Sequence, residues 1–186
     1  MTSHWAWLVG GVNAVAASVL VVAATAKLAA PRQSLLALRE LFGSRSERLT
    51  AHGVRAFAVV EVAAAVALLV AGTRTAGALL VAALGACFAS LGLLGRVRRS
   101  RVACGCFGRA GGRPLGLSNA AMGLALVLAA PLNLSIDVSA ATAHDYSRAA
   151  LIGAALGSLA FCLWVQRRVV LTLRRPIGSP AKEATS

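Results

Sequence analysis

Five long apolar stretches separated by short polar segments set the pattern of this chain. They run over residues 5–30, 53–71, 75–95, 115–134 and 149–165. Each is close to the roughly 20 residues that a helix needs to cross a hydrocarbon core of about 30 Å. The fifth stretch is short, and Pro131 leaves the end of the fourth uncertain. We therefore predict an all-α, polytopic membrane helical bundle with about five transmembrane helices, the alternative being four.

Composition agrees with a membrane protein and divides the chain into a bundle and a tail. Hydrophobic residues make up 58% of the sequence, and many are small enough for helices to approach closely in lipid. The first apolar stretch lacks a basic start and is too long for a signal peptide, so we expect it to remain as a helix. The prediction is a transmembrane bundle over residues 1–170 and a disordered cytoplasmic tail over residues 171–186.

The net charge of +13 lies mainly in alternate connections between the apolar stretches. Arginines are concentrated in residues 31–52, residues 96–114 and the tail, and they are few in the other two connections. This alternation is the positive-inside pattern of membrane proteins, and it argues against a nucleic-acid partner. We expect a multi-pass protein of the cell membrane with an extracytoplasmic N-terminus, a cytoplasmic C-terminus and a cytoplasmic 96–114 loop.

The arginine-rich 96–114 loop contains the strongest candidate for chemistry, Cys104-Gly105-Cys106. A disulfide across one residue closes a small ring, and glycine supplies the backbone freedom for it. Strained disulfides exchange readily, and nearby arginines favour the thiolate. We expect one cysteine to attack a partner's disulfide and the other to resolve the mixed disulfide. Phe107 and Gly108 would seat the pair at the start of the fourth helix.

Other interpretations of the four cysteines remain open. Cys104 and Cys106 could be ordinary reduced thiols of the cytoplasm. A structural metal site is disfavoured because zinc takes four ligands, whereas this loop offers two thiolates and no histidine. Cys87 and Cys162 lie in apolar stretches, where we expect them to fill the bundle as small apolar residues. An electron relay to the loop is the alternative for these two.

Two ionisable residues, Lys27 and Glu61, lie inside the apolar stretches, where a charge is costly and marks a functional candidate. Glu61 is about 13 Å along a helix from His52, so it must be paired, protonated or facing a polar cavity. We expect it inside the bundle. Lys27 is near the end of its helix; snorkelling to the headgroups is the favoured interpretation, and reaching toward Glu61 is the alternative. For Asn13 we expect a hydrogen bond between helices.

The order of these features resembles the methylamine utilisation protein MauE family, within the wider DoxX-like group of redox-associated membrane proteins. The features are Lys27, Glu61, the Cys-Gly-Cys motif between the third and fourth spans, and Asn119 in the fourth span. The resemblance covers roughly residues 5–165, and the motif is its most specific part.

Two positions depart from the family's pattern. MauE-type sequences tend to have an acidic residue before the first cysteine and an Arg-Asn pair at the start of the next helix. This chain has Ala103 and Ser118-Asn119 there. The specific pathway is therefore left open.

The resemblance implies a bundle that handles thiol–disulfide exchange, as in the maturation of a disulfide-rich enzyme of methylamine metabolism. It implies a thioredoxin-like or other redox protein as partner, and analogy with other small disulfide-forming membrane proteins adds a quinone as candidate cofactor. Maturation of exported proteins would place the thiols outside, whereas the arginines place them inside. We give the charges more weight; a re-entrant loop or a different span count would resolve the conflict.

Two rival functions come from other classes. The chain could be a non-catalytic assembly factor or scaffold whose cysteine loop binds a partner without turnover. It could also be a small transporter with Glu61 as a proton-coupled site. Loss of either loop cysteine should abolish redox function, whereas a scaffold should tolerate serine and a transporter should fail on Glu61→Gln.

Overall fold

The computed structural model describes residues 2–43, 50–99, 116–136 and 143–173. Across these ranges the chain forms helices and no strand, which confirms the all-α prediction. The elements are α1 (Thr2–Ala29), α2 (Pro31–Phe42), α3 (Ala51–Leu69), the short 3₁₀ helix η2 (Ala71–Thr73), α4 (Arg74–Val97), α5 (Leu117–Ser135) and α6 (Ala143–Leu173).

Four helical segments in the described part of the chain are long and apolar enough to cross a membrane. They are His4–Ala29, Ala51–Leu69, Ala71–Val97 and Leu117–Ser135. The fifth predicted span lies within α6, which is not among these four. Helix α5 continues past Pro131 to Ser135, so this proline does not end the helix. The number of spans fits the prediction of about five, with four as the alternative.

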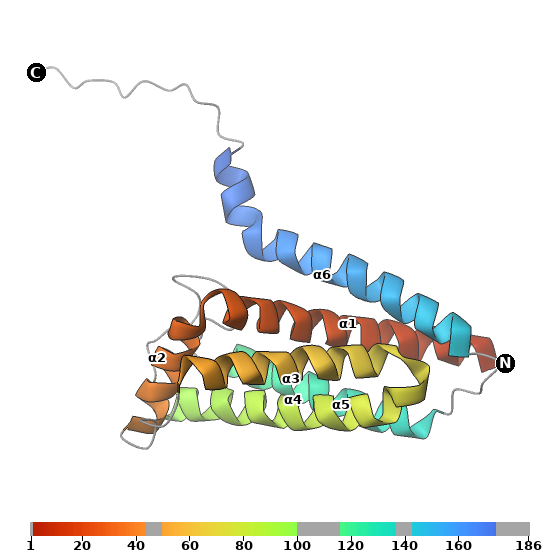
Figure 1. Cartoon of the computed structure of the whole chain (residues 1–186), viewed down its shortest axis with the longest axis horizontal. Coiled ribbons are helices and arrows are strands. Elements are labelled where there is room, and N and C mark those ends of the chain that lie inside the picture. Colours follow the sequence, from red (N-terminus) through yellow and green to blue (C-terminus); the bar gives the residue numbers. More distant parts are fainter. Residues whose placement is uncertain (1, 44–49, 100–115, 137–142, 174–186) are drawn as a thin grey trace, which may run out of the picture.

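Helices α1, α3, α4 and α5 lie side by side as a bundle, with α2 at the end where α1 stops (Figure 1). We call this the α2 end. Helix α6 starts beside the N-terminal part of α1, and its C-terminal part runs away from the bundle (Figure 1). The predicted tail from residue 171 overlaps the last turn of α6, and residues 174–186 lie outside the described ranges.

Small residues allow α4 and α5 to pack with their backbones in contact. A Cβ atom on Gly123 of α5 would collide with the backbone of Ala89 and the carbonyl oxygen of Gly85. A Cβ on Gly92 of α4 would lie 2.5 Å from the backbone nitrogen of Ala120. The pairings run in opposite directions along the two helices, so α4 and α5 are antiparallel. Helices in lipid associate by such close packing, because moving an apolar side chain from lipid into a helix contact gains little free energy.

Helix α6 packs against α1 in the same direction rather than the opposite one. A Cβ on Gly153 would lie 2.7 Å from that of Ala14, and a Cβ on Gly157 would lie 2.6 Å from Ser18 Oγ. One turn earlier, Gly10 faces Ala149. The numbers rise together along both helices, so α1 and α6 are parallel and meet along a row of small residues.

Helix α2 occupies much of the arginine-rich connection over residues 31–52, for which no helix was predicted. Its residues Ala37 and Leu41 form a small apolar cluster with Leu91 and Leu94 of α4. The guanidinium of Arg98 donates a hydrogen bond to the carbonyl oxygen of Leu41. The helix is short and amphipathic, with charged residues on one face. It was not predicted because the segment was interpreted from its charges and not from the spacing of its apolar residues. It ties the ends of α1, α3 and α4 together.

A polar cluster joins four helices nearer the opposite end of the bundle. The amides of Asn13 and Asn133 donate to each other's oxygens, both at 2.8 Å. Asn13 also donates to the hydroxyl of Tyr146 at 2.6 Å, and that hydroxyl donates to the carbonyl oxygen of Leu68. The cluster confirms the hydrogen bond between helices that was expected for Asn13. Each bond of this kind contributes roughly 0.6 kcal/mol in a membrane protein.

The glycine contact between α4 and α5 predicts a selective effect of adding one methyl group. Gly123→Ala should destabilise the protein by about 1–3 kcal/mol, because the backbone of α4 would have to move. Gly11→Ala is the matched control, since a Cβ there meets nothing within 4 Å. Thermal unfolding of both variants in detergent tests this; equal unfolding temperatures would contradict the α4–α5 contact.

Candidate functional site

Lys27 of α1 and Glu61 of α3 form an ion pair in the interior of the bundle. The Nζ atom of Lys27 lies 2.6 Å from Oε1 of Glu61. Glu61 is fully buried, and Lys27 is only 5% exposed. Burial of Glu61 inside the bundle was predicted and is confirmed. For Lys27, the favoured prediction of snorkelling to the headgroups is wrong, and the alternative is confirmed: its side chain pairs with Glu61.

Two phenylalanine rings flank the ammonium group of this pair. The centroids of Phe57 and Phe88 lie 5.6 and 5.1 Å from Lys27 Nζ. The rings meet edge to face, with centroids 6.3 Å apart and planes at 83°. Both distances fall within the range of cation–π attraction, which strengthens where water is excluded. We call Lys27, Glu61, Phe57 and Phe88 the Lys–Glu site.

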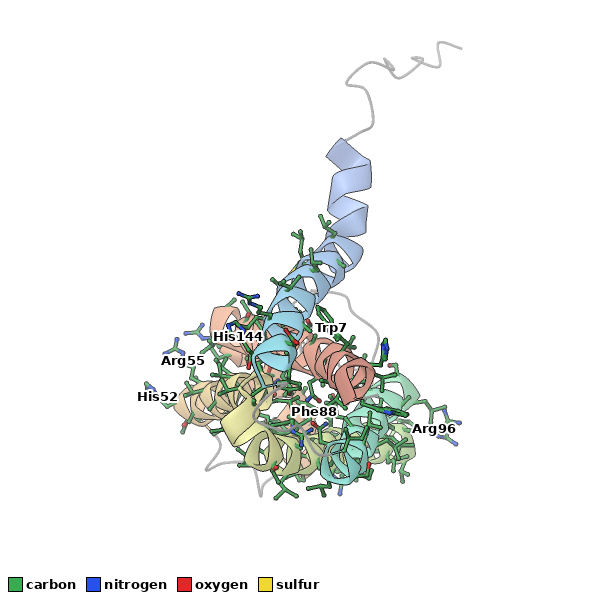
Figure 2. The ribbon with its side chains drawn as sticks, turned by 90° about the vertical axis from the view of Figure 1, so that its right-hand side faces the viewer. Trp7, His52, Arg55, Phe88, Arg96 and His144 are labelled. Carbon is green, nitrogen blue, oxygen red and sulfur yellow. The ribbon has the colours of Figure 1, made fainter. Side chains whose placement is uncertain are left out.

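The Lys–Glu site draws its residues from three helices: α1 provides Lys27, α3 provides Phe57 and Glu61, and α4 provides Phe88. Phe57 precedes Glu61 by four residues, one turn of α3, so the two side chains share a face of that helix. The end-on view in Figure 2 places Phe88 among the helices, with His52, Arg55 and Arg96 at the periphery. The site therefore joins three helices with aromatic rings around a pair of opposite charges.

One oxygen of the site is left without a partner. Oε2 of Glu61 is buried and accepts no hydrogen bond from the described residues. Lys27 donates one hydrogen bond, to Oε1, whereas an ammonium group carries three hydrogens. The arrangement can therefore accept a further hydrogen bond at Glu61 and donate further ones from Lys27. Chemically it can hold a proton or bind a polar group from a ligand.

The predicted thiol site, Cys104 and Cys106 with Gly105, Phe107 and Gly108, lies outside the described residues. The elements on either side of it are described: α4 ends at Val97 and α5 begins at Leu117. Both of these ends lie at the α2 end of the bundle, where Arg98 bonds to α2. Lys27 is in the last turn of α1, at the same end. The described ends of α4 and α5 thus lie at the same end of the bundle as Lys27.

Asn119 lies in the first turn of α5, just after the segment that carries the motif. Its backbone N–H donates to the carbonyl oxygen of Gly116 at 3.0 Å, which helps to start the helix. Its side chain is half-buried. The structure therefore brings Lys27 and Glu61 into contact and places Asn119 at the start of α5.

The two helix cysteines do not have the predicted position. Cys87 on α4 and Cys162 on α6 are exposed on the helix surfaces rather than packed inside the bundle. Exposing a small thiol to lipid costs little free energy, because lipid is itself apolar. The apolar character of a cysteine in a membrane helix therefore does not predict whether it faces the bundle or the lipid. Among the described residues, no group of three or more His, Cys, Asp or Glu could hold a metal ion.

Phe57, Phe88, Asn133 and Tyr146 were missed by sequence reasoning. Phe57 had a signal, since it precedes Glu61 by one helical turn. The other three come from helices distant in the sequence, and a single chain gives no indication of those pairings.

Comparison with known families identifies the class of protein that this bundle represents. The family model of methylamine utilisation protein MauE matches residues 5–134, which include α2 to α4 and almost all of α1 and α5. The chain belongs to the MauE family and is a multi-pass membrane protein. No curated protein and no solved structure matches it significantly.

The buried ion pair predicts that each of two single substitutions will lower the stability of the protein more than both substitutions made together. Lys27→Met leaves a buried carboxylate, and Glu61→Gln leaves a buried ammonium, so each should destabilise the protein by about 3–5 kcal/mol. The double variant should recover most of this loss, because no unpaired charge remains. Thermal unfolding of the three variants measures the coupling; additive losses would show that the pair does not interact.

Proposed function

We propose that this protein is a membrane-embedded thiol–disulfide redox protein of the MauE type, with Cys104 and Cys106 as its reactive pair. The observation that carries the proposal is the Cys104-Gly105-Cys106 motif in a chain that belongs to the MauE family. The motif lies between two membrane helices and among arginines, whose charge favours the thiolate that attacks disulfides.

The exchange moves two electrons in two steps. The thiolate of one cysteine attacks a disulfide of the partner; a mixed disulfide forms and one partner sulfur leaves as a thiolate. The thiolate of the second cysteine then attacks the first cysteine's sulfur, so the mixed disulfide breaks and the second partner thiolate leaves. The protein ends with a Cys104–Cys106 disulfide and the partner with two reduced thiols. The relative reduction potentials decide whether the reaction runs this way or in reverse.

The α4–α5 pair supports this proposal because it gives the motif a rigid base. The two helices have backbone contacts at Gly92 and Gly123, so the positions where the connecting segment begins and ends are held together. A reactive group on a connection between rigid elements can meet a partner while its base stays in place. We propose a thioredoxin-like protein as the partner. By extension from the MauE family, the process served would be the maturation of an enzyme of methylamine metabolism.

Serine substitutions at the motif test the redox function, and the helix cysteines provide the control. Cys104→Ser and Cys106→Ser should each abolish a reversible disulfide, whereas Cys87→Ser and Cys162→Ser should leave it unchanged. The readout is a redox titration of purified protein in detergent, followed by alkylation of free thiols and mass measurement. The midpoint should be more oxidising than about −300 mV, the value below which structural disulfides lie.

The same variants separate the rival functions when activity of the pathway is measured in cells. A scaffold would keep its activity with serine at both motif positions, and the pair would stay reduced under mild oxidant. A transporter would lose activity with Glu61→Gln and retain it with the cysteine variants. Either pattern would replace the redox assignment.

The distribution of arginines predicts the sidedness of the membrane protein. The N-terminus should be extracytoplasmic and the motif cytoplasmic, because arginine-rich connections stay inside. A membrane-impermeant maleimide should therefore fail to label Cys104 and Cys106 in intact, reduced cells and label them after the membrane is opened. A reporter fused before Trp5 that proved cytoplasmic would overturn this topology.

A further inference from the structure

Helix α2 presents two different surfaces, one to the bundle and one away from it. Its buried residues recur every three or four positions and lie on the side toward the bundle: Pro31, Ser34, Ala37 and Leu41. Leu36 and Phe42 are exposed instead, with 59% and 38% of their surface accessible. Arg32 is exposed as well. The outer surface of α2 therefore combines a cation with large apolar side chains.

The position of α2 is that of a helix in the membrane interface. The spanning segment of α1 ends at Ala29, and Ala30 leaves the helical conformation with φ −134° and ψ 62° before Pro31 starts α2. The chain turns there, so α2 runs across the end of the bundle and not along it (Figure 1). Because α1 is long enough to cross the hydrocarbon core, α2 begins where lipid headgroups replace the acyl chains.

Lipid is the surrounding that suits the exposed side chains of α2. Water around Leu36 and Phe42 would be unfavourable, whereas the upper parts of the acyl chains would cover both residues. A helix in the plane of the interface places its apolar side chains among acyl chains and its basic ones at the headgroups. Helix α2 has the side chains for both contacts.

Helix α3 provides a second cation at the same level. Arg55 lies one turn inside the start of α3 and shares a helix face with Val59, Val62 and Val66, all of which are exposed. Figure 2 shows Arg55 on the outside of the bundle. The valine row faces the acyl chains, so Arg55 lies where a lipid carries its headgroup. This position favours a lipid over a protein in solution as the occupant.

The two ends of the bundle differ in their charge. Exposed arginines are concentrated at the α2 end: Arg32, Arg39, Arg55, Arg96, Arg98 and Arg99. Among the described residues of that end, Glu40 is the one exposed acidic residue. At the opposite end, exposed Arg148 is accompanied by exposed Asp145. The excess of positive charge at the α2 end is complementary to the phosphates of anionic lipids.

We propose that the α2 end is a binding surface for the headgroups of anionic phospholipids. The guanidinium groups of Arg32 and Arg55 contact the lipid phosphates, to which a guanidinium can donate two parallel hydrogen bonds. Leu36 and Phe42 lie among the acyl chains of the same lipids. This binding involves no thiol chemistry, so it goes beyond the redox function and does not depend on it.

Native mass spectrometry of the full-length protein in detergent tests the proposal by counting bound lipids. Dioleoyl phosphatidylglycerol should bind about tenfold more tightly than dioleoyl phosphatidylcholine, and higher salt should reduce this preference. Arg32→Gln and Arg55→Gln should each weaken phosphatidylglycerol binding about fivefold, the factor that one basic residue contributes near an anionic surface. Arg32→Lys should retain most of the binding. Arg148→Gln, which removes an exposed arginine at the opposite end, is the matched control and should bind as wild type.

Two results would overturn the lipid surface. Phosphatidylglycerol might bind no better than phosphatidylcholine, or the Arg32→Gln/Arg55→Gln double variant might keep the full preference. If that variant keeps the preference but exchanges disulfides more slowly with a thioredoxin-like partner, the arginines form a protein docking surface instead.

A Cys104→Ser/Cys106→Ser double variant separates this inference from the redox function. It should bind phosphatidylglycerol as wild type does. A wild-type protein that prefers phosphatidylglycerol but performs no thiol exchange would support the lipid surface and remove the redox function. Thiol exchange without a lipid preference would do the reverse.

Discussion

The hydrocarbon surroundings of this bundle provide no hydrogen bonds, and this constraint explains where its polar residues lie. A polar side chain within the helices must find its partner in the protein, on its own helix or on another one. Two groups of buried side chains in the described residues meet this demand by pairing with each other: the amide and hydroxyl cluster around Asn13, and the Lys27–Glu61 pair about 21 Å further along α1. Contact between small residues then brings the helices close enough for these short side chains to meet.

The sequence was a reliable guide wherever the signal was local. The lengths and positions of the four spanning helices follow from the apolar stretches, since a helix in lipid must be apolar along its whole length. Burial of Glu61 followed from the cost of a charge in hydrocarbon, and the hydrogen bond of Asn13 from the same reasoning. These are properties of one residue in one helix, and no knowledge of the other helices was needed.

Prediction was weaker where the answer depends on which helices are neighbours. In a soluble protein the apolar face of a helix turns inward, but a membrane helix is apolar all round, so its pattern does not reveal the inner face. The outward positions of Cys87 and Cys162 and the ring of Phe88 beside Lys27 fall in this category. Helix α2 was missed for a different reason: its arginines suggested a polar loop, although its apolar residues recur at helical spacing.

The parallel packing of α1 and α6 has a consequence for how the protein is made. Helix α1 is synthesised first, yet the helix along its row of small residues is synthesised last. Asn13 likewise finds its partners on the late helices α5 and α6. Until those helices enter the membrane, the amide of Asn13 faces lipid or the insertion machinery. Before α5 and α6 are made, the first helix is therefore held by its hydrophobicity and by its contacts with α3, which include the Lys27–Glu61 pair; helix α6 then completes the packing around Asn13.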